Sequence, residues 1–157
     1  MPVEPGVVDA NVLAYAANAD VPHHAASRAL LDAARDPSVR LYVTSQILCE
    51  FYSVITNPRR VAAPSSSAEA LGIISALLAL PGIQVLPSPA RAVTALLELL
   101  RRHPVTGGEV FDLQIVATMQ ENSVRRIYTF NAGDFEVFPE LIVVVPGVQA
   151  GGSFQNA

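Results

Sequence analysis

Short apolar strands alternate with helical segments along almost the whole chain, and this alternation is the strongest constraint on its fold. The expected strands are rich in Val, Ile, Leu and Tyr and cover residues 6–9, 41–43, 83–86, 126–129 and 141–145. The expected helices cover residues 11–17, 24–35, 46–56, 71–80 and 88–102, and a further helix includes 109–119. Such alternation predicts an α/β fold, a three-layer α/β/α sandwich with a central, mainly parallel sheet of about five strands.

Length and composition agree with one helix-covered sheet. The chain has 157 residues, of which 51% are hydrophobic and 15% charged, so most elements should be heavily buried. We expect a single domain over residues 1–145 and a loose Gly/Gln/Ser-rich tail over 146–157.

Residues 70–90 have no charge, which raises the question of a membrane span. Pro81, Pro87 and Pro89 interrupt the segment, and its helical part would cover only ~15 Å. We therefore expect a core segment and no membrane. The N-terminus shows no signal-peptide pattern. Cys49 is the single cysteine, which fits a reducing cytoplasm, and we expect it to be a small buried apolar residue.

The charges are unusual, because all ten basic residues are arginine and the formal net charge is −4. This balance argues against a broad basic surface for nucleic acid. A local arginine rim remains possible, and the pairs at 59–60, 101–102 and 125–126 could supply it. For each pair, a solvated helix end is the more common explanation.

Asp112 is the most informative single residue. At about 100° per residue it falls in the middle of an apolar helix face formed by Phe111, Ile115, Val116 and Met119. An ionised carboxylate that faces a core costs several kcal/mol unless a cation or strong donors meet it. The alternative is a first-turn acid favoured by the helix dipole.

Further polar residues follow the expected strands. Asp9 ends the first strand, Asn131 and Asp134 follow the fourth, and Glu50 lies on the flank of the helix after the second. In open α/β sheets, ligands bind beyond the carboxyl ends of the strands. Three or four carboxylates that converge there repel one another unless a hard cation lies among them. Oxygen ligands without clustered Cys or His predict Mg²⁺ or Mn²⁺.

Each of these residues also has a purely structural alternative. Asp9 could cap the next helix, Glu50 could be a rim residue, and Asn131 and Asp134 could be turn residues.

Other chemistries fit less well. His23 and His24 have no second pair with zinc-ligand spacing, and no P-loop, nucleophile elbow or dinucleotide fingerprint is present. An aspartate-nucleophile phosphatase needs Asp-x-Asp and a lysine. Asn11 occupies the third position here, and the chain has no lysine.

Four segments together resemble one known family. They are residues 7–13 (VVDANVL), 43–50 (VTSQILCE), 111–117 (FDLQIVA) and 128–135 (YTFNAGDF). From residue 7 to about 145 the chain resembles PIN-domain ribonucleases, specifically the VapC-type toxins of bacterial toxin–antitoxin modules. Each motif alone is weakly specific, whereas four in the right order are specific together.

The resemblance implies the chemistry of the site. Asp9, Glu50 and Asp112 would be ligands of Mg²⁺, with Mn²⁺ as a substitute, and a metal-activated water would hydrolyse RNA. Asn11 and Thr129 would orient carboxylates or the water.

One position departs from the family, because many members have an aspartate where Asn131 stands. Asp134 could supply the missing carboxylate, or the site could work with three acids.

The resemblance also implies a cytoplasmic homodimer and a cognate VapB-type antitoxin whose C-terminal segment would fill the groove over the acids. The apolar helices around 71–80 and 92–100 could form these interfaces or could be ordinary core faces. The alternative function is a catalytically impaired PIN-like module that binds RNA or a protein partner. Asn131 is the only sequence feature that favours this alternative.

Overall fold

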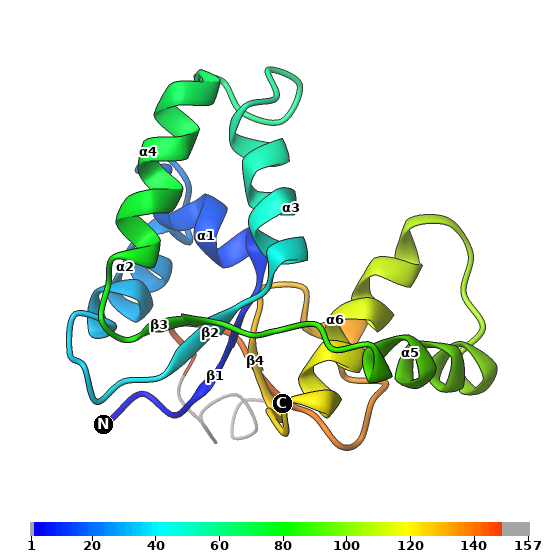
Figure 1. Cartoon of the computed structure of the whole chain (residues 1–157). Coiled ribbons are helices and arrows are strands. Elements are labelled where there is room, and N and C mark those ends of the chain that lie inside the picture. Colours follow the sequence, from blue (N-terminus) through cyan, green and yellow to red (C-terminus); the bar gives the residue numbers. More distant parts are fainter. Residues whose placement is uncertain (1, 149–157) are drawn as a thin grey trace.

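A five-stranded, all-parallel sheet forms the centre of the protein, as a computed structural model that describes residues 2–148 shows (Figure 1). Its strands are β1 (Gly6–Val8), β2 (Leu41–Val43), β3 (Ile83–Val85), β4 (Arg126–Tyr128) and β5 (Ile142–Val144). Their order in the sheet is β3-β2-β1-β4-β5, and every neighbouring pair is parallel. The predicted α/β class, strand number and parallel arrangement are confirmed.

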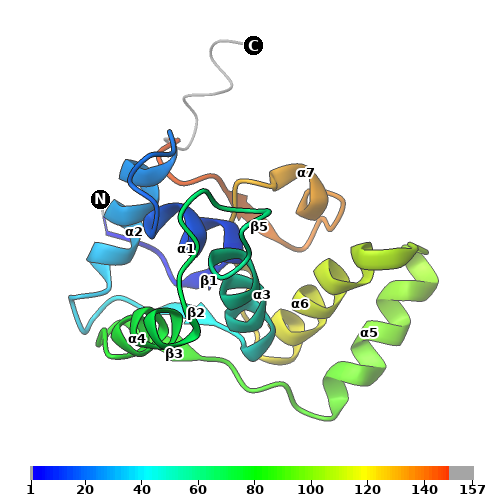
Figure 2. The same cartoon turned by 90° about the horizontal axis from the view of Figure 1, so that it is seen from above.

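The helices follow the predicted order with small shifts at their ends. They are α1 (Ala10–Ala16), α2 (His24–Ala33), α3 (Ser45–Ile55), α4 (Ser67–Leu78), α5 (Arg91–Arg102), α6 (Val110–Glu121) and α7 (Ala132–Phe135). A 3₁₀ turn, η1 (Gly107–Glu109), leads into α6. Helices α1 to α4 lie together, and α5 lies beside α6 on the other flank of the sheet (Figure 2). The short α7 was not predicted, because a single turn has too few residues to show a helical period.

Helix α4 begins earlier than its apolar run predicts. The Ser66 hydroxyl accepts a hydrogen bond from the Glu69 backbone N–H, and a Glu69 carboxylate oxygen accepts one from the Ser66 N–H. This reciprocal capping box satisfies two backbone donors that a helix start leaves free. The polar first turn is therefore helical although it adds nothing to the apolar pattern.

The three central strands are almost completely buried. Val7, Val8, Leu41, Val43 and Ile127 have no solvent-exposed surface, as expected for parallel strands covered on both faces. These apolar strands position the polar residues that follow them.

Helix α6 differs from the prediction of one apolar face. Its buried residues are Leu113, Ile115, Val116, Ala117, Thr118 and Met119, whereas Phe111 is 52% exposed. The helix packs against α5 and also belongs to the core that the sheet shares, so its later turns are covered on most sides. Its first turn lies at a cleft, which leaves the Phe111 side chain largely in solvent and Asp112 at the rim.

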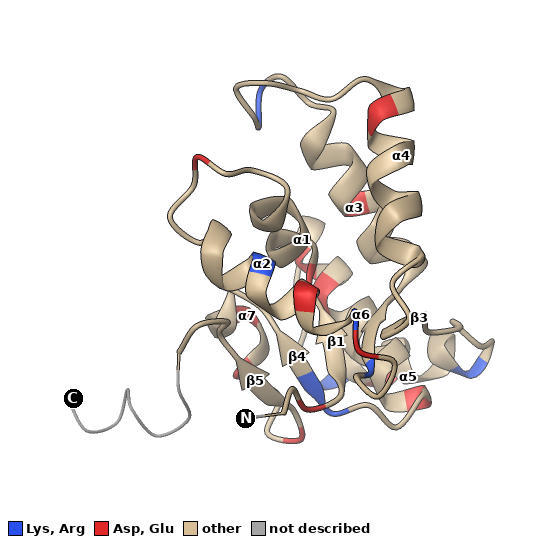
Figure 3. Ribbon diagram, turned by 90° about the vertical axis from the view of Figure 1, so that its left-hand side faces the viewer, with Lys and Arg blue, Asp and Glu red and all other residues tan. Residues whose placement is uncertain are grey.

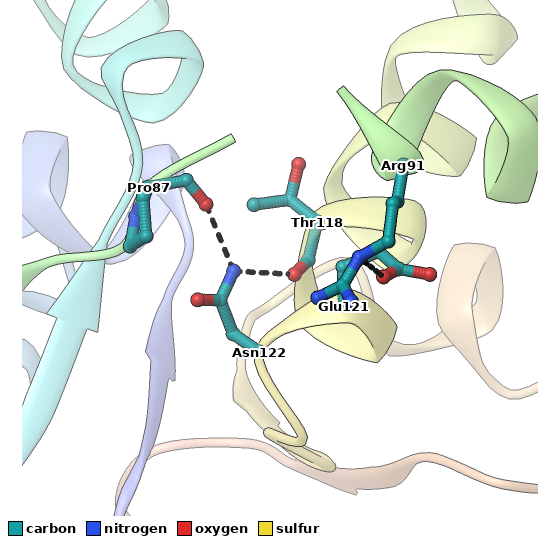
Figure 4. A network of polar contacts seen from close by, with 5 residues as sticks. All are labelled: Pro87, Arg91, Thr118, Glu121 and Asn122. Carbon is teal, nitrogen blue, oxygen red and sulfur yellow. Dashed lines mark hydrogen bonds and ion pairs between the residues drawn. The ribbon is translucent and has the colours of Figure 1, made fainter. Parts of the chain in front are cut away.

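The C-terminal end of α6 is fixed to the segment that enters α5 (Figure 4). The Asn122 side-chain amide donates to the Pro87 carbonyl at 2.9 Å and to the Thr118 carbonyl at 2.8 Å. An ion pair of 3.0 Å joins Arg91 to Glu121. These contacts hold the helix that presents Asp112 at its opposite end.

Two further predictions concern a membrane span and the boundary of the domain. Within residues 2–148, no helix is long and apolar enough to span a bilayer. The expected division into a domain of residues 1–145 and a tail of 146–157 stays a prediction, because most of that tail lies outside the described residues.

Candidate active site at the carboxyl edge of the sheet

The strand order places a crevice between the ends of β1 and β4. The chain passes from β1 to β2 on one side, and returns from β3 to β4 on the other side of β1. At such a reversal the two connections run in opposite directions and leave a crevice beyond the carboxyl ends of the strands. Open α/β sheets bind ligands in crevices of this kind. A cleft of about 850 Å³ opens at this edge. Residues that line it include Asp9, Asn11, Tyr15, Gln46, Cys49, Glu50, Arg60, Asp112 and Asn131.

Asp9 lies at the base of this cleft and is only 6% exposed. One carboxylate oxygen accepts a hydrogen bond from the Ala10 N–H at 2.8 Å, so Asp9 does cap α1. The other accepts from the Thr129 hydroxyl at 2.8 Å and from the Asn11 amide at 3.3 Å. Burial raises the pKa of Asp9 above its usual range, although these hydrogen bonds oppose the shift.

Thr129 and Asn11 connect the ends of β1 and β4. The Asn11 amide N–H also reaches the Thr129 hydroxyl oxygen at 3.3 Å, and its carbonyl oxygen accepts from the Phe130 N–H at 3.1 Å. The Asn131 N–H donates to the Thr129 hydroxyl oxygen at 3.0 Å. The Asp9 carboxylate is therefore held in one orientation by side chains from two strand ends.

Asp112 is half-buried and enters the same cleft from the first turn of α6. Burial raises the pKa of Asp112 to about 6, and the negative charges of Asp134, Asp9, Glu50 and Glu109 add to the shift. The ion pairs described in residues 2–148 involve none of the acids that line this cleft. The carboxylates therefore face one another without a direct ion pair to an arginine.

Glu50 reaches the cleft from α3 and is also half-buried. Burial raises the pKa of Glu50, and the charge of Asp9 contributes. The Gln46 amide donates to Glu50 Oε1 and to the Phe111 carbonyl, both at 2.8 Å. Gln46 thus fixes Glu50 against the start of α6. This role of Gln46 was not predicted, although residues four positions apart on one helix are neighbours on its surface.

Asn131 and Asp134 come from the start of α7. Asn131 is exposed and lines the cleft. Asp134 is exposed and is not among the lining residues, yet its charge raises the pKa of both Asp9 and Asp112. The structure therefore brings four of the five predicted residues into one cleft and places Asp134 at its border.

The donor set of this cleft suits a hard divalent cation. Its charged groups are carboxylates that raise one another's pKa, and a cation would relieve that repulsion. Within residues 2–148, however, no three acidic, histidine or cysteine side chains stand close enough together to hold an ion as they are. The oxygen-rich ligand chemistry fits a hard cation such as Mg²⁺ or Mn²⁺.

Of the three arginine pairs, only one contributes to the cleft, through Arg60. Arg101 is paired with Glu98 on α5, and Arg125 donates to the Glu140 carbonyl. In the view of Figure 3 the ribbon segments of arginine residues are scattered among those of Asp and Glu. Of the six residues in the three arginine pairs, Arg60 is the one that lines the cleft.

The prediction that Cys49 is buried was wrong. Its thiol is exposed and lines the cleft beside Glu50. The core-facing side of α3 is formed by Ile47, Phe51 and Ile55, and position 49 points away from it.

The fold and this site define a PIN domain, and comparison with known proteins agrees. The PIN domain profile matches residues 6–141. The chain is 33% identical over 116 residues to VapC ribonuclease Mb2897 of Mycobacterium bovis, across 74% of this chain and 79% of the relative. It is similar to the same extent to ribonuclease VapC43 of Mycobacterium tuberculosis.

Two solved structures share the fold. VapC20 of Mycobacterium tuberculosis, described as a sarcin-ricin loop cleaving toxin, has a TM-score of 0.66 at 20% identity, covering 89% of this chain and 98% of that one. VapBC2 from Rickettsia felis, bound to a DNA fragment from its promoter, has a TM-score of 0.64 at 16% identity, covering 91% and 99%. The chain therefore belongs to the PIN-domain family, in its VapC-type group.

Proposed function

We propose that this protein is the toxin of a VapBC toxin–antitoxin system and a metal-dependent endoribonuclease that hydrolyses RNA phosphodiester bonds with a metal-activated water. The convergence of Asp9, Glu50 and Asp112 in one cleft above β1 and β4 is the main support. The identity to VapC ribonucleases over most of the chain supports the choice of RNA as substrate.

In this proposal Asp9, Glu50 and Asp112 hold Mg²⁺, or Mn²⁺ as a substitute. The bound ion would activate a water and stabilise charge on the phosphate. Thr129 and Asn11 orient Asp9, and Gln46 orients Glu50, through the hydrogen bonds described above. Such supporting contacts commonly change metal affinity or activity by 10- to 100-fold, as an order of magnitude.

Asn131 and Asp134 complete the proposed catalytic set. Asn131 lines the cleft and offers an uncharged amide where many relatives have an acid. Asp134 is close enough for its charge to act on Asp112, so we assign it the role of the fourth acid.

A first experiment tests the function directly. Purified protein is incubated with a mixed cellular RNA pool in Mn²⁺ or in EDTA, beside Asp9→Ala and Asp112→Ala. We expect discrete cuts that require both the metal and each aspartate. Asp32→Asn, which changes an exposed acid on α2 that pairs with Arg28, is the control and should cut like the parent.

An absence of cutting by folded, antitoxin-free protein saturated with Mn²⁺ would contradict the nuclease. It would favour the catalytically impaired PIN-like module that binds RNA or a protein partner. A measurement of Mn²⁺ affinity then separates the two cases, because a degenerate site should bind the ion weakly.

The same proposal includes a homodimer, a VapB-type antitoxin and a cytoplasmic location. Helix α4 buries only Ala70 and Leu77, and Leu71 is 63% exposed. Helix α5 leaves Val93 61% and Leu97 47% exposed. Because these apolar side chains are exposed and lie outside the core, we assign them to the dimer interface and the antitoxin interface. Light scattering of Val93→Ser with Leu97→Ser should report loss of the dimer if α5 forms it.

A second cleft of about 420 Å³ offers a further contact for the antitoxin, in addition to the groove over the acids that its C-terminal segment is expected to fill. It is lined mainly by apolar side chains of α1 to α4, including Leu13, Phe51 and Leu77, and by the arginines Arg28 and Arg35. An apolar segment with an acidic residue would match this lining. Co-expression with the neighbouring small gene product, followed by Ile73→Asp, tests the assignment through loss of co-purification, because Ile73 lines this cleft and is 37% exposed.

A further inference from the structure

Three aromatic rings from separate segments form a cluster beside the acidic cleft. Tyr15 comes from α1, His23 immediately precedes α2, and Phe130 follows β4. The His23 and Phe130 rings are stacked, with centroids 4.2 Å apart and planes inclined by 24°. Tyr15 meets Phe130 nearly edge-on at 5.3 Å and His23 at the same distance.

The inner part of the cluster is joined to the catalytic network. The Phe130 N–H donates to the Asn11 side chain, which in turn contacts Asp9. Phe130 also stands between Thr129 and Asn131 in the chain, and Asn131 lines the cleft. The position of the Phe130 backbone is thus set by the same contacts that orient the acids.

The α1–α2 side of the cluster is also fixed. Tyr15 lines the cleft together with Asn18 and Val21 of the following loop. A ring nitrogen of His24 lies 2.9 Å from the Tyr15 carbonyl oxygen and joins the start of α2 to α1. The loop that presents His23 is therefore attached at both ends.

His23 is the outer member of this cluster. Its side chain is exposed, whereas Tyr15 and Phe130 are partly buried. One face of its ring rests on Phe130, and no further aromatic ring within residues 2–148 stacks on it. An exposed ring supported from beneath by a second ring contributes little to a core, but it suits a planar ligand.

Unpaired nucleic-acid bases are planar ligands of this kind. Single-stranded RNA is commonly held by bases stacked on aromatic side chains, while bases in an A-form helix are already stacked and unavailable. We propose that Tyr15, His23 and Phe130 form a stacking platform for one unpaired RNA base that flanks the cleaved phosphate. The inference rests on the proposed ribonuclease function and narrows its substrate to RNA that is single-stranded at this nucleotide.

The first test measures stacking without cleavage. A short single-stranded RNA with one 2-aminopurine is titrated with the full chain bearing Asp112→Asn, and its fluorescence is followed, because stacking quenches this base. We expect quenching that His23→Ala abolishes and His23→Phe retains. His103→Ala is the matched control, because His103 also contacts a phenylalanine, Phe138, but lies at the end of α5, which contributes no residue to the cleft.

The second test measures cleavage with the otherwise unaltered active site. His23→Ala should raise the KM for a single-stranded substrate by about tenfold, the order of one lost base stack, with kcat nearly unchanged. His23→Phe should restore the KM. Replacing the flanking base with an abasic nucleotide should remove the difference between the parent and His23→Ala.

The outcomes separate the platform from the nuclease. Equal quenching and equal KM for the parent and His23→Ala would overturn the platform while leaving the nuclease intact. Quenching that depends on His23 without any cutting by the parent would support the platform and overturn the nuclease. If His23→Ala unfolds, comparison of His23→Phe with His23→Leu decides whether an aromatic ring is required.

Discussion

The Thr129 hydroxyl donates a 2.8 Å hydrogen bond to the Asp9 carboxylate, across 120 positions of sequence. Thr129 is fully buried and Asp9 nearly so, so the bond is largely shielded from solvent. The contact joins the ends of the two strands between which the cleft opens. It therefore connects the folding of the sheet to the orientation of an acid in the candidate site.

Thr129→Val should weaken metal-dependent cleavage while largely preserving the shape of the side chain. Loss of the donor leaves Asp9 less well oriented, and we expect the Mn²⁺ concentration for half-maximal cleavage to rise by about tenfold. Titration of cleavage against Mn²⁺ measures this shift. Thr118→Val is the control, because the Thr118 hydroxyl bonds only the Gln114 carbonyl within α6. An equal effect of both substitutions would contradict a specific role for Thr129.

Asp112→Asn should stabilise the metal-free protein at neutral pH. The pKa of Asp112 is raised to about 6, so the folded state binds a proton more tightly than the unfolded state does. The ionised Asp112 carboxylate therefore lowers the stability of the folded state. This destabilisation is absent below about pH 4, grows as the pH rises toward 6 and is fully present above that value. Because the group is half-exposed, we discount the shift for solvent screening and expect about 1 kcal/mol of added stability.

Urea unfolding in EDTA across this pH range measures the effect, and Asp112→Ala should change the stability in the same direction. Asp36→Asn is a control for which we expect the opposite change in stability, a loss at neutral pH. Hydrogen bonds from the Ser38 N–H and hydroxyl lower the pKa of Asp36, so its favourable contribution is present at neutral pH and is lost as the pH falls. A metal-free Asp112→Asn variant less stable than the parent at pH 7 would count against a repulsive cluster.

Arg60→Ala should reduce the salt dependence of RNA binding, because Arg60 is the arginine that lines the cleft. Loss of one phosphate contact with a single strand should reduce the slope of log K against log salt by about 0.7. Arg59→Ala removes the same charge from the neighbouring position, which does not line the cleft. Fluorescence anisotropy at several salt concentrations should show a smaller slope for Arg60→Ala alone. Slopes equal to that of the parent for both variants would show that neither arginine contacts RNA. An equal reduction in both variants would show that the contact is not specific to Arg60.

Asn122→Ala should destabilise the fold by about 1–2 kcal/mol, because two backbone carbonyls, of Pro87 and Thr118, lose their side-chain donor (Figure 4). Arg91→Ala breaks the neighbouring ion pair with Glu121, but Arg91 is 77% exposed. Its loss should change stability by less than about 0.5 kcal/mol. Chemical denaturation of both variants compares the two effects. A larger loss of stability for Arg91→Ala would show that the ion pair, and not the Asn122 hydrogen bonds, is the main contact between α6 and the start of α5.

Local sequence patterns predicted the elements of the sheet and the residues that end them. Apolar runs located all five strands, and Asp9 could be placed at the end of the first strand because strand limits follow directly from composition. The four motifs also indicated the family correctly, since residue identity and order are sufficient for that comparison.

Helical periodicity was less reliable for α6. It placed Phe111 on the same buried face as Ile115, Val116 and Met119, whereas Phe111 is 52% exposed in the structure. Periodicity indicates which residues share a side of a helix, but coverage depends on which elements pack around it. The same reason explains Cys49, whose exposure follows from the orientation of α3 above the cleft.

The sequence by itself determined the parallel α/β architecture and the family, and it supplied the acids that we propose as the site. Only the tertiary structure decided that Gln46 supports Glu50, that Arg60 alone of the arginine pairs lines the cleft, and that His23 stacks on Phe130. These contacts join positions brought together by the packing of helices and by the placement of β4 beside β1. Strand order and helix packing depend on how much apolar surface all elements bury together, and a local sequence pattern does not show this.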